Sequence, residues 1–351
     1  MPAHALQITP PERFPLIDAF RVVASQLIML SHLVTYGPLP VAAREIIPGT
    51  VDWIYSYARI AVQAFLVISG FLAARSLAAG DMRDSPLRLI GRRYLRLVMP
   101  YAAAIVLAII SAEAAALWMT DESIPPRPEP LHVLAHLLLL HDLHGLEALS
   151  AGIWYIAIDF QLFTLMTLLV WCGRLWRPAL ALLPGVWVAS LFWFNRNPGW
   201  DACALYFFGS YGLGAAAWWA SQRRNAPSWI ATATVIVLCA LMVDFRLRIA
   251  VALAVAVALG ISRRSGFAGR CLNGLPLGIL SKTAYAVFLV HFPVCLLVNA
   301  LFVRLGWVNP AGAVLGLLAA WALSMTAADQ FYRWIEAPAG KWRISALSCR
   351  A

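Results

Sequence analysis

The sequence predicts an all-α, polytopic membrane protein with about ten transmembrane helices and both termini in the cytoplasm. Apolar residues make up 62% of the chain and charged residues only 13%, and the mean hydropathy is +0.75. A soluble domain would contain about 25% charged residues. The apolar residues also gather in runs of about 17–25, the length that a helix needs to cross a bilayer.

Ten apolar segments form the predicted spans. In chain order they cover 16–36, 53–74, 95–118, 151–172, 178–194, 203–221, 228–244, 246–262, 279–303 and 311–334. A shorter apolar segment, 131–146, cannot comfortably cross a bilayer, and we interpret it as an interfacial or re-entrant helix before the fourth span. We expect one membrane domain over 1–351, with short cytoplasmic tails at 1–15 and 337–351.

The basic residues predict the orientation of these spans. A net charge of +10 could indicate a nucleic-acid partner, but the arginines lie in short loops between apolar runs. Most of the 27 lysines and arginines fall on the side that holds the N-terminus, as the positive-inside rule predicts for the cytoplasm. We therefore predict a lipid bilayer as the partner, and no nucleic acid. The six cysteines have no CxxC spacing, so we expect neither a metal site nor a disulfide framework.

Three ionisable residues lie in the first apolar segment: Asp18, Arg21 and His32. Burying charge in hydrocarbon is costly, so ionisable groups inside a span indicate function by default. His32 lies about 16 Å from Arg21 along a helix, and a neutral imidazole can act as a general base near pH 7. A second histidine, His291, occurs inside the ninth span. The structural alternative is a neutral histidine hydrogen-bonded between helices.

Two arginines, Arg93 and Arg96, are three residues apart at the expected cytoplasmic end of the third span, and so project from one helix face. Because a guanidinium binds phosphate with two parallel hydrogen bonds, this face suits a phosphorylated cofactor. The alternative is plain positive-inside signalling.

Further polar residues lie near the predicted span ends. Asp159, inside the fourth span, should pair with a histidine or an arginine, either at a site or only structurally. Ser69 and Gly70 form a small-residue patch that usually indicates close helix packing. Asp329 and Arg333 have the i,i+4 spacing of a surface ion pair.

Six stretches, taken in order, resemble motifs of the acyltransferase-3 family of integral-membrane acyltransferases. They are LIDAFR (16–21) followed by His32, AFLVISGFL (64–72), RRYLRLVMPY (92–101), WYIAIDFQLF (154–163), TAYAVFLVHFPV (283–294) and YRWIEAP (332–338). The order and spacing cover nearly the whole chain. The fourth stretch departs from the family pattern, because Asp159 stands where glutamate is commoner and Phe160 occupies the second acidic position.

The resemblance implies transfer of an acyl group from cytoplasmic acyl-CoA, most often acetyl-CoA, to a hydroxyl of a glycan or glycolipid at the bacterial inner membrane. It implies that His32 acts as a base or carries the acyl group transiently, that Asp159 or His291 orients it, and that Asp18 belongs to the same catalytic set. Arg21, Arg93, Arg96 and Ser69 would bind the donor, and no metal is expected. A proton-coupled transporter is the alternative function, although the chain has no repeat between its halves. A structural membrane subunit would leave the buried charges unexplained. The oligomeric state stays open.

Overall fold

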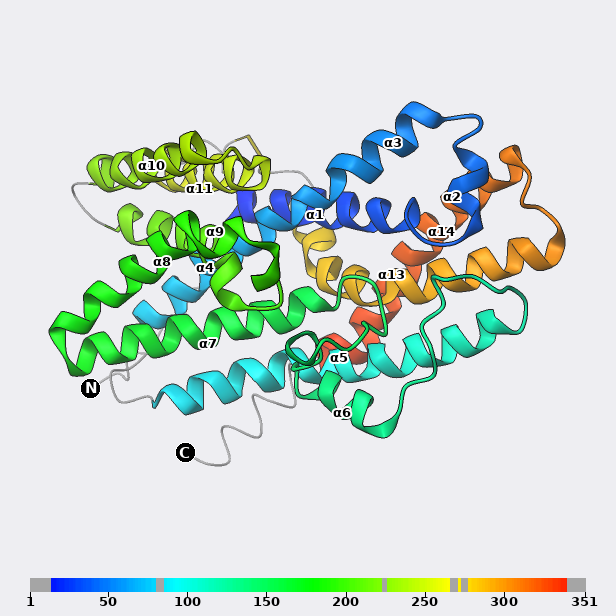
Figure 1. The fold of residues 1–351 in the computed structure, drawn as a ribbon, viewed down its shortest axis with the longest axis horizontal. Coiled ribbons are helices and arrows are strands. Elements are labelled where there is room, and N and C mark those ends of the chain that lie inside the picture. The colour runs from blue at the N-terminus through cyan, green and yellow to red at the C-terminus, as the bar shows by residue number, and fades with distance from the viewer. Residues whose placement is uncertain (1–13, 80–84, 223–225, 266–270, 273–276, 340–351) are drawn as a thin grey trace, which may run out of the picture.

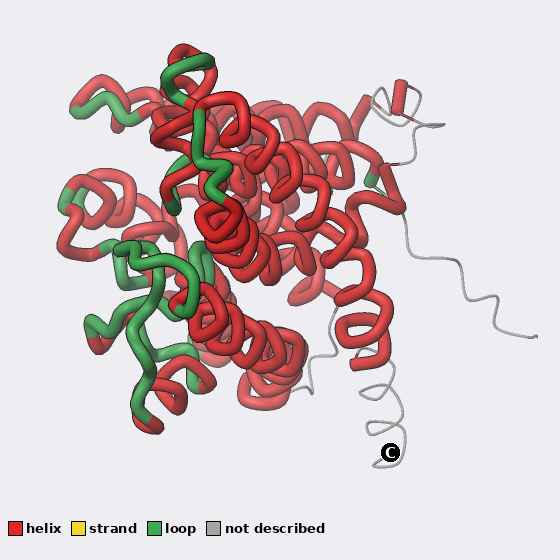
Figure 2. The backbone as a smooth tube through the Cα atoms, turned by 90° about the vertical axis from the view of Figure 1, so that its right-hand side faces the viewer, coloured by secondary structure: helices red, strands yellow, loops and turns green. Residues whose placement is uncertain are grey.

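The computed structural model describes residues 14–79, 85–222, 226–265, 271–272 and 277–339. Within these ranges the chain is helical and contains no strand, which confirms the all-α prediction (Figures 1 and 2). The longer helices are α1 (Pro15–Leu33), α4 (Val62–Ala79), α5 (Pro86–Ala116), α7 (Trp154–Leu175), α8 (Leu182–Phe192), α9 (Ala204–Ser221), α10 (Ala226–Val243), α11 (Leu247–Ser265), α13 (Leu277–Leu305) and α14 (Pro310–Phe331). The shorter ones are α2 (Pro38–Ala43), α3 (Pro48–Tyr57), α6 (Pro130–Leu137) and several single helical turns.

Local sequence determines where these helices begin. Pro15, Pro86 and Pro310 occupy first helical positions, where the missing N–H of proline removes a donor that would have no partner inside the helix. The side chains of Ser85 and Asn309 each accept a hydrogen bond from the backbone N–H three residues later. These caps satisfy donors at the start of α5 and α14.

Seven helical segments are long and apolar enough to cross a membrane, counted over the described ranges alone. They are Pro15–Leu33, Pro48–Ala79, Pro86–Ala116, Trp154–Leu175, Arg177–Arg196, Leu280–Leu305 and Pro310–Ala339. The predicted spans 203–221, 228–244 and 246–262 are also helical, as α9, α10 and α11, but they are not among the seven. The protein is thus a polytopic membrane protein, while the count of ten and the cytoplasmic termini stay predictions.

The helices pack around two large apolar cores, which meet along α1 and α7, and a smaller third cluster around Phe292. One core joins α4, α8, α9 and α11, on the left in Figure 1, and the other joins α5, α13 and α14, on the right. Ile17 and Ala24 of α1 belong to the first core, whereas Ile28, Met29 and Leu33 belong to the second. Residues on α1 and α7 can therefore face the seam between the cores, which is where the polar site lies.

Two glycines allow α4 and α9 to cross in close contact. A Cβ atom on Gly70 would lie 1.9 Å from the carbonyl oxygen of Tyr211, and one on Gly214 would lie 1.9 Å from that of Val67. Only glycine fits at both positions, which confirms that the Ser69–Gly70 patch serves helix packing. This crossing holds α4 in place and sets the position of Ser69 beside the site.

The connection between α5 and α7 returns the chain to the middle of the molecule. Its only regular α-helix is α6, which has 8 residues and cannot cross a membrane. The connection ends at Gly152, which has a φ of +83°, a conformation that favours glycine. This turn brings the start of α7 against His32.

Candidate active site

A buried pair of histidines joins α1 to α13. His32 Nδ1 lies 2.7 Å from His291 Nε2, and the two rings are nearly parallel with centroids 4.9 Å apart. His32 is 6% exposed and His291 is fully buried. The structure therefore brings together two predicted site residues that are 259 positions apart in the chain.

The hydrogen bonds of this pair assign its protons. His291 Nδ1 lies 2.9 Å from the carbonyl oxygen of Val287. A carbonyl can only accept, so Nδ1 of His291 carries the hydrogen, and Nε2 of the neutral ring then accepts from His32 Nδ1. This leaves the lone pair of His32 on Nε2. His32 Nε2 is thus the nitrogen that can act as a base or a nucleophile.

The approach to His32 is narrow. A Cβ atom on Gly152 would lie 3.1 Å from His32 Cε1 and 3.1 Å from the ring of Phe288. The ring of Tyr36 packs on another side of His32, with centroids 5.9 Å apart. A substituent at position 152 would therefore press on both His32 and Phe288.

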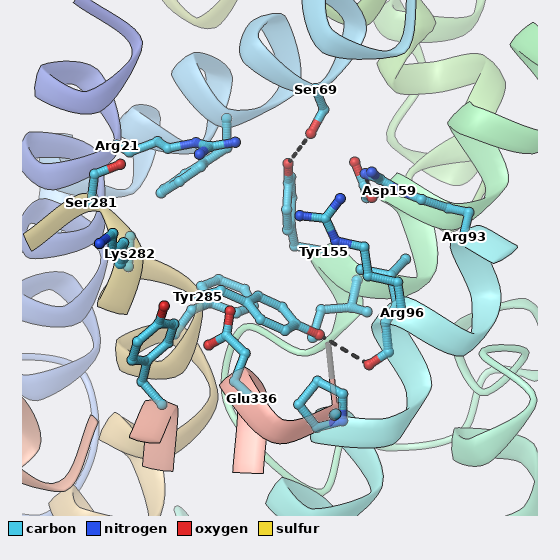
Figure 3. Close-up of a pocket in the computed structure, with 18 of the residues that line it drawn as sticks. Arg21, Ser69, Arg93, Arg96, Tyr155, Asp159, Ser281, Lys282, Tyr285 and Glu336 are labelled. Atoms are coloured by element: carbon cyan, nitrogen blue, oxygen red, sulfur yellow. Dashed lines mark hydrogen bonds and ion pairs between the residues drawn. The ribbon is translucent and has the colours of Figure 1, made fainter. Parts of the chain in front are cut away.

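A cavity of about 700 Å³ lies at the seam between α1, α4, α5, α7 and α13 (Figure 3). Four basic residues line it: Arg21 of α1, Arg93 and Arg96 of α5, and Lys282 of α13. Its other polar lining residues include Ser69, Tyr155, Asp159, Ser281, Tyr285 and Glu336. The predicted donor-binding residues Arg21, Ser69, Arg93 and Arg96 thus share one cavity, and its basic character suits a polyanionic ligand.

Arg93 and Asp159 form an ion pair in the wall of this cavity. Arg93 Nη2 donates to Asp159 Oδ2 at 2.5 Å, and the Asp159 side chain is only 4% exposed. Asp159 thus meets the expectation of an arginine partner, but the expectation that it orients His32 has no contact to support it. Arg93 Nε and Asp159 Oδ1 have no hydrogen-bond partner in the described chain.

The other residues of the first motif lie at the edge of the cavity. Asp18 Oδ1 accepts a hydrogen bond of 2.7 Å from Ser281, and it lies within electrostatic range of Arg21. The Arg21 side chain projects toward the cavity (Figure 3). Asp18 therefore anchors α1 to α13 beside the cavity, about 21 Å along α1 from His32.

Three aromatic rings line the cavity, and one of them, that of Phe288, also borders the histidine pair. Phe65, Tyr155 and Phe288 line the cavity, with ring centroids of neighbours 6.0 and 5.7 Å apart. The Phe288 ring also lies 6.3 Å from that of His291. The hydroxyl of Tyr155 is hydrogen-bonded to Ser69. His32 and His291 are not among the lining residues, so the cavity ends short of the pair at the ring of Phe288. We call Phe65, Tyr155 and Phe288 the aromatic partition.

Sequence reasoning did not predict six of the polar lining residues as site residues: Tyr155, Ser281, Lys282, Tyr285, Tyr332 and Glu336. Each lies within or next to a stretch that carries the family resemblance, which was the available signal. The predicted surface pair of Asp329 and Arg333 is confirmed, with 2.7 Å between its atoms and both side chains exposed. Within the described ranges, no group of three or more histidine, cysteine, aspartate or glutamate residues is arranged to hold a metal ion.

A second histidine cluster lies outside the membrane-spanning segments, in the connection between α5 and α7. The rings of His136 and His141 are stacked with centroids 4.0 Å apart. Burial lowers the pKa of His136 to about 4 and that of His141 to about 3. Burial raises the pKa of the neighbouring Asp142 to about 6. Both histidines are therefore neutral near pH 7 in the folded connection.

The fold and the site together define an integral membrane protein with a polar reaction site buried among its helices. The profile of the acyltransferase-3 family, described as an acyltransferase domain, matches residues 14–329. The chain therefore belongs to this family and is a membrane acyltransferase. Comparison with curated proteins and with solved structures finds no match. The family membership favours an enzyme over the transporter and structural-subunit alternatives.

Proposed function

We propose that this protein transfers an acyl group, most often acetyl, from cytoplasmic acyl-CoA to a hydroxyl of a glycan or glycolipid at the bacterial inner membrane. The observation that carries the proposal is the hydrogen-bond chain from Val287 through His291 to His32, which leaves one basic nitrogen on His32. The ring of Phe288 borders both this histidine pair and the cation-lined cavity. The histidine pair supplies the base for the reaction, and the cavity supplies the binding site for the donor.

The cavity suits acyl-CoA as the donor. Its volume of about 700 Å³ falls within the range of about 300–1,000 Å³ that is usual for small-molecule sites. Arg21, Arg96 and Lys282 supply positive charge from three helices, and guanidinium groups bind phosphate with directional hydrogen bonds. The phosphates of the donor would lie among these cations, with the pantetheine arm directed toward the aromatic partition.

The chemistry follows from the tautomer of His32. Nε2 takes the proton of the acceptor hydroxyl as its oxygen attacks the thioester carbonyl. The carbon–sulfur bond then breaks, the CoA thiolate leaves, and the proton on Nε2 passes to that sulfur. Throughout, His32 Nδ1–H stays bonded to His291, which holds the ring in the productive orientation. Transient transfer of the acyl group to Nε2 is the alternative route with the same residues.

Access of the donor to His32 requires movement in the aromatic partition. Phe288 borders both the cavity and Gly152 beside His32, so rotation of its ring would open a direct path. Closing the partition afterwards would exclude water, which otherwise hydrolyses the thioester. We therefore assign to Phe65, Tyr155 and Phe288 the role of protecting the thioester from water.

Label transfer tests the proposal. Purified protein in nanodiscs receives radiolabelled acetyl-CoA, alone and with membrane glycolipid extracts. We expect labelled lipid or CoA release from the wild-type protein and none from His32→Ala. His144→Ala serves as the matched control, because His144 is an exposed histidine outside the site. Full activity in a folded His32→Ala protein would refute the role of His32, and an absence of CoA binding across several acyl-CoAs would refute the donor.

A further inference from the structure

The helical turn that follows α14 directs the carboxylate of Glu336 toward the cavity. After Phe331 the helix continues as a π-helical turn over Tyr332–Glu336. A π-turn is wider than an α-turn and so changes which way the following side chains face, and such turns are frequent at functional sites. Asp329 and Arg333 pair on the exposed surface, whereas Glu336 lines the cavity. Figure 3 shows its carboxylate pointing inward beside Tyr285.

Glu336 lies within electrostatic range of two arginines that line the same cavity. Its Oε2 atom is buried and accepts no hydrogen bond from these residues. The positive charges that act on it are those of Arg96 and Arg21, which line the same cavity. The negative charge of Glu336 thus lies where it offsets the positive charges of Arg96 and Arg21.

A carboxylate in this position opposes a polyanionic ligand. The phosphates of CoA and those of acyl-CoA are the same, and juxtaposed like charges weaken binding. We propose that Glu336 is an internal counter-ion that offsets the charges of Arg21 and Arg96 before the donor binds, and that it lowers the affinity for the donor and for product CoA. This inference rests on the proposed function and adds a residue that sets how readily CoA leaves.

A hydrogen-bonding role for Glu336 would have the opposite consequence. If the carboxylate accepted a hydrogen bond from an N–H group of the donor, its removal would weaken binding. If the role of Glu336 were purely structural, its substitution would change the stability of the protein. It would not change the affinity for CoA relative to that for uncharged pantetheine. The sign of the change in affinity therefore separates the three roles.

The experiment compares two carboxylates on the same segment. Glu336→Gln and Asp329→Asn remove the same charge, but only Glu336 faces the cavity. Dissociation constants for CoA, acetyl-CoA and uncharged pantetheine are measured by calorimetry at pH 8. We expect Glu336→Gln to bind CoA and acetyl-CoA at least about five-fold more tightly, with pantetheine unchanged and Asp329→Asn equal to wild type. KM for acetyl-CoA should fall in parallel.

Glu336→Met provides a second uncharged variant of similar length if the glutamine variant does not fold, and folding is checked by elution profile and thermal midpoint. Unchanged or weaker CoA binding in the folded variant overturns the proposal, as does an equal gain for pantetheine. If wild-type protein binds CoA but the variant shows no gain, only this inference fails. If wild-type protein binds no acyl-CoA, the proposed function fails and this inference with it.

Discussion

Arg93 and Asp159 join α5 to α7 at the seam between the two apolar cores. The ion pair is 2.5 Å long, and its carboxylate is almost completely buried. Guanidinium Cζ of Arg93 also lies 5.3 Å from the centroid of the Phe163 ring. The pair fixes one wall of the cavity, so its removal tests how much the site depends on the seam.

We expect Asp159→Ala to destabilise the protein by up to about 3 kcal/mol, because it leaves the largely buried Arg93 charge without its partner. The thermal unfolding midpoint in detergent measures the effect. Asp329→Ala removes a carboxylate from an exposed pair and should cost less than about 1 kcal/mol. Equal midpoints for the two variants would contradict the structural role of the buried pair.

His291 should act through His32 rather than through the donor. We expect His291→Leu to lower kcat about 100-fold or more, because His32 loses the acceptor that fixes its tautomer. KM for acetyl-CoA should hardly change, since His291 does not line the cavity. His291→Gln, whose amide oxygen can accept from His32 Nδ1, should recover part of kcat. A large rise in KM with kcat unchanged would argue against this positioning role.

Gly152 and Gly145 form a matched pair of glycines. Both have positive φ, +83° and +64°, but a Cβ on Gly152 would press on His32 and Phe288 whereas one on Gly145 would meet nothing within 4 Å. Both alanine variants should therefore lose about 1–3 kcal/mol of stability through backbone strain. Only Gly152→Ala should also lose activity at temperatures where both variants are folded. Steady-state kinetics below the unfolding temperature separate the effects, and equal activities would show that the approach to His32 is wider than the geometry indicates.

The histidine cluster predicts that acid loosens the connection between α5 and α7. The folded pKa values of about 4 for His136 and about 3 for His141 lie below the unfolded value of about 6.5. The two histidines therefore bind protons in the unfolded segment but not in the folded one. The stability of the folded connection consequently falls as the pH drops from about 6.5 toward 4. Asp142, with a folded pKa of about 6, takes up one proton in the folded state and offsets part of this loss.

Hydrogen exchange over 131–146, corrected for the intrinsic pH dependence, measures this loosening. With one net proton bound on opening, protection should fall by at most about ten-fold per pH unit. His141→Phe should flatten the dependence, because it removes one of the two histidines that take up a proton on opening. Phenylalanine should be tolerated there, since both ring nitrogens of His141 lack a hydrogen-bond partner in the described chain. His144→Ala, at an exposed position, should leave it unchanged. A wild-type segment whose protection rises in acid would contradict the assignment.

The sequence by itself determined the membrane-spanning helical class and the residues that could take part in binding or catalysis. Run length and charge content are local properties, so the apolar helices and His32, His291, Arg93 and Asp159 could be identified without a structure. The order of the six motifs supported the family, which the profile match over residues 14–329 then showed.

Only the tertiary structure decided which of these residues meet. The 2.7 Å contact of His32 with His291 depends on how α1 packs on α13, and the partner of Asp159 depends on how α7 packs on α5. Sequence spacing carries no information on such contacts between distant segments. The π-turn that directs Glu336 inward is set by the surrounding packing, because local propensity in a continuous helix favours the α-helical turn. Glycine permits the positive φ at position 152, but only the tertiary structure places that turn against His32.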